Sequence, residues 1–266
     1  MARAVTEAPE EIFSNIHNPS SGRPFLAVLR QASLYKKVVF MPYPHFVLSL
    51  PSWIDSFLRE PERSYPSIEE RMRLVVQLSR LNFEEGTGGP FGAGIFDMQT
   101  GRLIAPGVNL VVPSNCCIVH AEMVAIMIAQ QAMGSYDLAA EGLPPCEMVV
   151  STEPCAMCLG AIPWSGIRRL VCGARDEDAR SIGFDEGAKI PDWVTTLEER
   201  NITVLRDVCR SEAATVLRAY LESGGVIYNS RRNACTRLIH DGHSEKLTQR
   251  PRGLDNDPGD PLSQHR

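Results

Sequence analysis

The sequence of 266 residues lacks any apolar run long enough to cross a membrane. Its most apolar early stretch, residues 38–54, is interrupted by Pro42, Pro44 and Pro51. No basic segment leads into an apolar one near the first residue, so we expect no secretory signal and a cytoplasmic location. Hydrophobic residues make up 44% of the chain and charged residues 22%, as is typical of folded domains, which excludes a mostly disordered protein.

Basic charge is scarce in the central part of the chain. Residues 51–230 carry 15 basic and 24 acidic side chains, a net charge of −9, whereas residues 1–50 and residues 231–266 each carry a net charge of +2. Affinity for nucleic acid depends on basic side chains that displace counterions from phosphates. The acidic centre therefore argues against a nucleic-acid partner and favours a small substrate that is uncharged or cationic.

Hydrophobic periodicity and turn residues predict one α/β domain over residues 48–230. One helix precedes two strands, and helices and strands then alternate, an order that predicts a three-layer α/β/α sandwich around a mixed central sheet. Residues 1–47 are expected to form a partly disordered extension, and residues 231–266 a polar, disordered tail. The expected helices cover residues 68–81, 120–133, 155–164 and 211–221, and the expected strands cover residues 93–96, 103–108, 147–151, 170–174 and 202–205.

Three side chains have the chemistry and spacing of a zinc site. The chain has eight cysteines, and without a secretory signal these predict metal ligation or core packing rather than a disulfide framework. Cys155 and Cys158 are three residues apart, which places both thiols on one face of a helix. His120 begins a separate helix and is the only histidine of the predicted core. Together they predict a zinc ion with three protein ligands and a fourth position for water.

Glu122 gives this predicted site a catalytic group. It follows His120 by two residues, where its carboxyl group can take a proton from a zinc-bound water and pass it on. His-x-Glu followed by Pro-Cys-x-x-Cys is the signature of zinc nucleobase deaminases. Both halves of the signature are expected to begin helices, whose N-termini favour negative charge. A purely structural zinc stays open as an alternative, because Cys116 or Cys117 could supply a fourth ligand.

At these residues the chain resembles the zinc deaminases of the cytidine deaminase fold, and most of all the guanine deaminases among them, some of which also accept ammeline. The resemblance covers roughly residues 50–231. It implies a zinc-dependent enzyme that acts on a small purine-like substrate, and a homodimer. The matching segments are residues 88–93 (GGPFGA), 107–109 (GVN), 120–122 (HAE), 151–160 (STEPCAMCLG), 162–166 (IPWSG) and 182–187 (IGFDEG).

The resemblance also implies roles for four further residues. Asn109 corresponds to an asparagine that hydrogen-bonds the bound base. Glu186 corresponds to a second carboxylate in the pocket, which could accept the two adjacent donors of guanine or relay a proton to the departing ammonia. Phe91 and Trp164 lie in segments that line the pocket.

The sequence therefore predicts hydrolytic deamination of a purine base, with guanine converted to xanthine and ammonia. One alternative is another small substrate, namely guanosine, cytosine, cytidine or an aminotriazine such as ammeline. A second is a tRNA adenosine deaminase that holds RNA with its basic tail. A third is a zinc-containing scaffold without catalysis, although a scaffold needs no carboxylate beside the metal.

Overall fold

The computed structural model describes residues 46–60 and 62–229. Contacts divide the chain into two units, Met1–Ser49 and Leu50–Arg266, and the second unit holds every described helix and strand. Nearly all of the predicted extension and the whole predicted C-terminal tail lie outside the described residues. The outer boundaries of the predicted domain therefore stay predictions.

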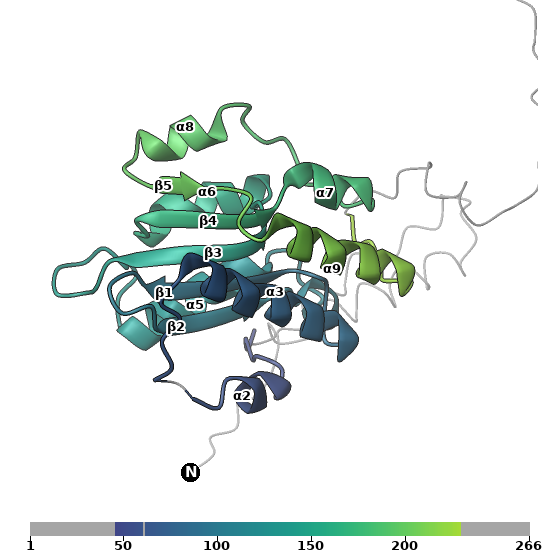
Figure 1. Ribbon diagram of the computed structural model, residues 1–266, viewed down its shortest axis with the longest axis horizontal. Helices are drawn as coiled ribbons and strands as arrows, with labels where there is room; N and C mark the ends of the chain where they lie inside the picture. The colour runs from purple at the N-terminus through teal and green to yellow at the C-terminus, as the bar shows by residue number, and fades with distance from the viewer. Residues whose placement is uncertain (1–45, 61, 230–266) are drawn as a thin grey trace, which may run out of the picture. The chain divides into compact units, whose positions relative to one another are not determined.

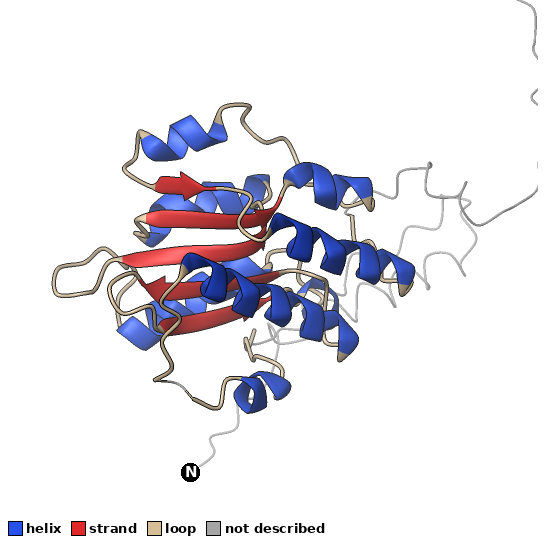
Figure 2. Ribbon diagram, viewed as in Figure 1, coloured by secondary structure: helices blue, strands red, loops and turns tan. Residues whose placement is uncertain are grey.

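A mixed five-stranded sheet forms the centre of the second unit, in the order β2-β1-β3-β4-β5. Strand β1 (Gly92–Asp97) runs antiparallel to both of its neighbours, β2 (Leu103–Val108) and β3 (Cys146–Thr152). Strand β4 (Arg169–Ala174) runs parallel to β3 and to β5 (Thr203–Leu205) (Figure 2). All five predicted strands are present, with ends that differ from the prediction by no more than one residue.

Helices cover both faces of the sheet and complete the three layers. In Figure 1, α3 (Ile68–Glu84) and α9 (Arg210–Glu222) lie in front of the sheet, and α5 (Ala121–Met133) and α6 (Ala156–Ser165) lie behind it. One cluster of buried apolar side chains fills each of the two gaps. Strand β3 is buried at every position, because neighbouring strands and both helical layers surround it. The predicted three-layer α/β sandwich is thus confirmed.

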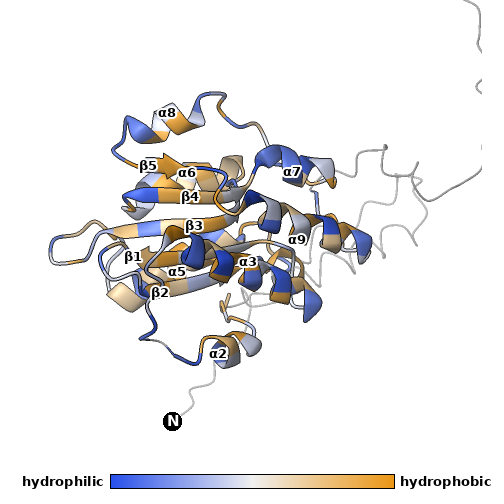
Figure 3. Cartoon of the chain, in the orientation of Figure 1, coloured by the Kyte–Doolittle hydropathy of each residue, from blue (hydrophilic) through white to orange (hydrophobic). Residues whose placement is uncertain are grey.

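The pattern of hydropathy explains this layering. Figure 3 shows mainly apolar colours on the central strands, whereas polar and apolar residues alternate along α3 and α9. Helix α3 begins at a capping box, in which the Glu70 backbone N–H donates to the Ser67 hydroxyl and the Ser67 N–H donates to the Glu70 carboxylate. Helix α5 ends at Gly134, whose φ of +65° suits glycine. These local signals are why the long helices lie where the sequence predicts them.

Four short helices were not predicted. Each has four to six residues, which is less than two turns, so hydrophobic periodicity cannot reveal it. None of the helices within residues 46–60 and 62–229 is long and apolar enough to cross a lipid bilayer. The four short helices are α2 (Trp53–Phe57), α4 (Val111–Ser114), α7 (Asp176–Ser181) and α8 (Trp193–Glu198).

Candidate metal centre and active site

The candidate site lies where α5 and α6 begin, beside the carboxyl end of β3. His120 is the N-cap residue of α5, Cys155 is the N-cap residue of α6, and Cys158 lies in the first turn of α6. Strand β2 and helix α5 pack closely at Gly107, where a Cβ atom would lie 2.1 Å from the carbonyl oxygen of Ala121. This glycine therefore lets the first turn of α5 hold His120 close to the sheet.

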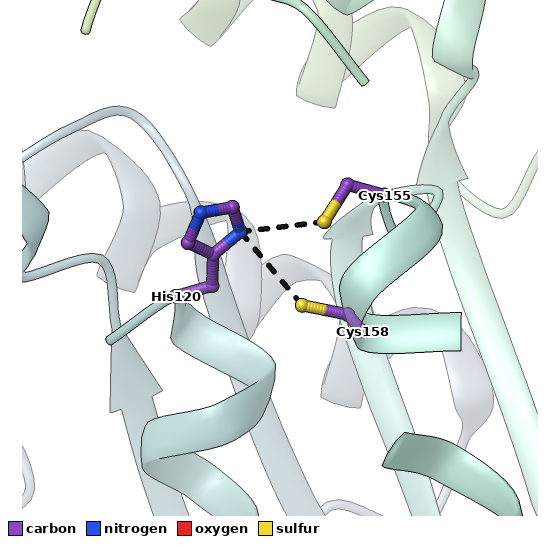
Figure 4. Close-up of side chains that lie close together, drawn as sticks. All are labelled: His120, Cys155 and Cys158. Atoms are coloured by element: carbon purple, nitrogen blue, oxygen red, sulfur yellow. Dashed lines mark hydrogen bonds between the residues drawn. The ribbon is translucent and has the colours of Figure 1, made fainter. Parts of the chain in front are cut away.

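The three predicted ligands fit a single zinc ion. His120 Nδ1 lies 3.5 Å from Cys155 Sγ and 3.7 Å from Cys158 Sγ, and Figure 4 shows this nitrogen facing both sulfur atoms. With zinc bonds of about 2.0–2.1 Å to nitrogen and about 2.3 Å to sulfur, tetrahedral geometry separates the two donors by about 3.5–3.6 Å. Neither Cys116 nor Cys117 joins the group, nor does any other His, Cys, Asp or Glu of the described chain. One coordination position is therefore left for water.

The protonation of these side chains favours a bound cation. The Cys158 thiol donates a hydrogen bond to Cys155 and lowers the pKa of Cys155 to about 4. The same hydrogen bond, together with burial, raises the pKa of Cys158. Burial alone would lower the pKa of His120, but the hydrogen bond with Cys155 and the charge of Glu122 outweigh it and raise that pKa. A metal ion replaces the shared proton and compensates the negative charge.

Glu122 lies in the first turn of α5 and lines the same cavity as His120 and Cys155. Its side chain is buried, and the residue is only 8% exposed. Burial raises the pKa of its carboxyl group, and the negative charge of Cys155 raises it further. A buried carboxyl group with a raised pKa can hold a proton and release it within one reaction cycle.

A cavity of about 180 Å³ is lined by the metal donors His120 and Cys155 and by two other predicted residues, Asn109 and Glu186. Pockets for drug-sized ligands usually measure about 300–1,000 Å³, so this cavity suits a smaller molecule. Glu186 is 7% exposed, and burial beside Cys155 and Glu122 raises its pKa to about 8. Its backbone oxygen accepts a hydrogen bond of 2.9 Å from the Ala156 N–H, which ties the loop of Glu186 to the start of α6.

Asn109 is held in the cavity wall by three hydrogen bonds. Its N–H donates to the Phe91 carbonyl (3.1 Å), its carbonyl accepts from Asn82 Nδ2 (2.8 Å), and its side-chain Oδ1 accepts from the Val111 N–H (3.3 Å). Its side-chain amino group has no partner within residues 46–60 and 62–229. This group is therefore free to donate to an acceptor on a bound molecule.

The two predicted aromatic residues lie in different places. Phe91 lines the cavity and packs edge-to-face on Phe184, with ring centroids 4.9 Å apart. Trp164 is 85% exposed and lines a separate hollow together with Trp193. Trp164 is not among the residues of this chain that line the cavity with the metal donors, so its role in the pocket stays a prediction.

The sequence did not reveal several residues of the cavity wall. Phe184 and Cys117 line it, and so do Tyr228 and Asn229, which follow the last helix. Asn229 fixes the end of this segment, because its Oδ1 accepts from the Asp185 N–H at 2.9 Å. Tyr228 and Asn229 are residue types that often contact ligands, and this was the only sign of their role in the sequence. No known motif spacing connects them with the distant metal ligands.

The chain is similar to known zinc deaminases. Residues 66–174 match the family model of the cytidine and deoxycytidylate deaminase zinc-binding region. A curated relative, guanine deaminase from Bacillus subtilis, is 37% identical over 134 residues, which are 50% of this chain and 81% of that protein. The chain belongs to the zinc-dependent deaminases with the cytidine deaminase fold.

Two solved structures are similar to this deaminase. NE0047 in complex with 2,6-diaminopurine is 45% identical with a TM-score of 0.66, and the match covers 70% of the deaminase and 97% of that chain. Guanine deaminase from Nitrosomonas europaea is 43% identical with a TM-score of 0.64, and the match covers 68% of the deaminase and 100% of that chain. The family model spans His120, Glu122, Cys155 and Cys158, whereas Glu186 lies beyond its end.

Proposed function

We propose that this deaminase converts guanine and water to xanthine and ammonia. One observation carries the proposal: two of the three metal donors, His120 and Cys155, line one small cavity together with the buried carboxyl groups of Glu122 and Glu186. Guanine deaminases among the relatives of the chain support the same substrate.

Glu122 is the residue that moves protons in this proposal. Bound zinc, held by His120, Cys155 and Cys158, supplies a water molecule of lowered pKa and polarises the site. Glu122 takes one proton from the attacking water and gives it to the ring nitrogen beside the reacting carbon. It then takes the second proton, from the hydroxyl group on the tetrahedral carbon, and gives it to the departing amine, which leaves as ammonia. The N-termini of α5 and α6 stabilise the negative charge that develops as the ring carbon becomes tetrahedral.

Glu186 and Asn109 select the substrate. Guanine presents the N1–H and the 2-amino group as adjacent donors, and the Glu186 carboxylate accepts from both. Adenine has no such donor pair, and a site built to bind these donors rejects analogues that lack them. The amino group of Asn109 donates to an acceptor of the base, and Phe91 packs against the ring.

A panel of candidate substrates tests the proposal. Ammonia release is measured with the zinc-loaded protein on guanine, guanosine, cytosine, cytidine and ammeline. We expect guanine to have the highest kcat/KM, and faster release from a nucleoside or a pyrimidine would contradict the assignment. Negligible tRNA binding that does not change with salt concentration is expected from the net charge of −9 in residues 51–230.

The assembly is a further part of the proposal. We propose a homodimer, as the family resemblance implies, and the exposed apolar side chains of Trp164 and Ile190 are compatible with an interface. Light scattering should give twice the mass of 29.4 kDa for the purified protein. The expected cytoplasmic location stays a prediction.

A further inference from the structure

Lys189 is an unusual cation in this chain. It is the only lysine between residues 38 and 245, where arginine supplies the other positive charges. Its side chain is also buried, with 9% exposed. Lysine is almost never fully buried unless it is paired, and its ammonium is a compact point charge rather than a planar fork. The position therefore suits a small buried positive charge.

The ammonium of Lys189 connects two loops of the site. It lies 2.9 Å from Asp176 Oδ1 and 3.9 Å from Glu153 Oε2, and it stands 5.4 Å from the centre of the Trp193 ring. Glu153 precedes Pro154 and the zinc ligand Cys155, is buried, and lines the cavity. Lys189 itself follows Glu186 by three residues, so its charge links the Glu186 loop to the loop that holds Cys155.

The Glu153 carboxylate has two further partners besides Lys189. Its Oε1 pairs with Arg206 Nη2 at 2.6 Å, and its Oε2 accepts from the Asp176 N–H at 3.2 Å. Because Glu153 follows β3, Arg206 follows β5 and Asp176 begins α7, Lys189 is attached to residues at the ends of regular elements of the fold. The charge of Lys189 also lowers the pKa of Glu186, against the larger effect of burial, which raises it.

We propose that Lys189 is a positioning residue, which holds the Glu186 carboxylate at the substrate by anchoring its loop to Glu153 and Asp176. The inference rests on the proposed function, in which Glu186 binds the base. The other hydrogen bonds across this loop, from Ala156 N–H to the Glu186 oxygen, from Arg180 Nη2 to the Gly187 oxygen and from the Asp185 N–H to Asn229, hold its backbone and leave the side chain of Glu186 free to turn away. The buried charge of Lys189 restricts that loop from its far end.

A double-mutant cycle tests whether Lys189 acts through Glu186. Lys189→Met keeps the apolar stem against Trp193 and removes the charge; Lys189→Gln is the second variant should the first fail to fold. We expect Lys189→Met to lower kcat/KM for guanine by about tenfold to a hundredfold, the usual cost of losing a residue that supports a site, with unchanged zinc content. In a Glu186→Gln background the same substitution should cost less than about twofold, because its target is gone.

A control substitution at Arg102 tests whether the loss of a positive charge alone lowers activity. Arg102→Met removes an exposed charge that pairs with Glu62, and its activity should match that of the parent. Equal losses from Lys189→Met in both backgrounds, or no loss in the parent, would overturn the inference. A crystal structure of zinc-loaded Lys189→Met separates this inference from the proposed function, because it needs no turnover. The Glu186 carboxylate should leave its position in the cavity, and an unmoved carboxylate would refute the positioning role even if guanine is not the substrate.

Discussion

Replacing Glu122 by glutamine should abolish turnover while leaving the zinc site and the fold intact. Glutamine keeps the size of the side chain but cannot carry a proton from water to the base. General acid–base catalysis contributes about 10²–10⁴-fold, and the proposed mechanism gives Glu122 more than one proton transfer, so we expect kcat to fall by at least about 10³-fold. That loss corresponds to about 4 kcal/mol of activation free energy. His120, Cys155 and Cys158 are untouched, so zinc content should not change.

The stability of the Glu122→Gln variant gives a second, independent readout. Burial raises the pKa of Glu122 in the folded, metal-free chain above its value in the unfolded chain. The folded state therefore holds this proton more tightly, so its contribution to stability is lost as pH rises through the folded pKa. Metal-free Glu122→Gln should consequently unfold at higher urea concentration than the parent at pH 8, and the difference should vanish below about pH 4.

Urea titrations and stopped ammonia assays on the same preparations measure both effects. Glu141→Gln is a matched control, because Glu141 is exposed and does not line the cavity. It should retain the activity and stability of the parent. A Glu122→Gln protein with more than a tenth of the parent's kcat would refute the role of Glu122 in proton transfer, and a variant that has lost its zinc would show a structural role instead.

Three further predictions follow from buried or paired carboxylates. Glu186→Gln should lower kcat/KM for guanine by about 10²-fold, since a charged hydrogen-bond partner is lost, while the midpoint of thermal unfolding should not fall, because burial raises the pKa of Glu186 and glutamine has no charge to bury; turnover equal to that of the parent would place Glu186 outside the site. Glu147 is fully buried and forms ion pairs with Arg71 and Arg169. Because Glu147→Ala leaves these largely buried charges without a partner, it should lower the free energy of unfolding, measured by urea titration, by about 3–5 kcal/mol. A loss below about 1 kcal/mol would contradict this. Hydrogen bonds from Arg210 lower the pKa of Asp178, so its stabilising effect is present above about pH 4 and is lost as pH falls through the folded pKa. Asp178→Asn should therefore be less stable than the parent at pH 7, and the difference should shrink as pH falls below about 4; a difference that does not change with pH would contradict this.

The zinc ligands and Glu122 could be predicted because their signals are local. Cys155 and Cys158 are one helical turn apart, and His120 and Glu122 share the first turn of another helix, so spacing alone brings each pair together. Hydrophobic periodicity and turn residues likewise predicted the sheet and the long helices. Glu186 could be proposed only from the resemblance, since nothing around it in the sequence distinguishes it from a solvated acidic loop.

The remaining features depend on tertiary contacts. Tyr228 and Asn229 reach the cavity only because the chain turns back after α9, far in sequence from Asn109. Trp164 is an aromatic residue of the kind that lines pockets, but its high exposure and its absence from the cavity wall depend on how α6 packs. Lys189 is conspicuous in composition, yet its partners Glu153 and Asp176 could not be known before the loops were placed.

The most direct test of the account is a zinc titration of the metal-free protein with guanine as substrate. Xanthine and ammonia are measured after each addition, and bound metal is determined on the same sample. We predict that both products appear in equal amounts and that their rate of formation rises in proportion to zinc until each chain holds one ion. Full activity without bound metal, or a zinc-loaded protein that leaves guanine unchanged, would contradict it.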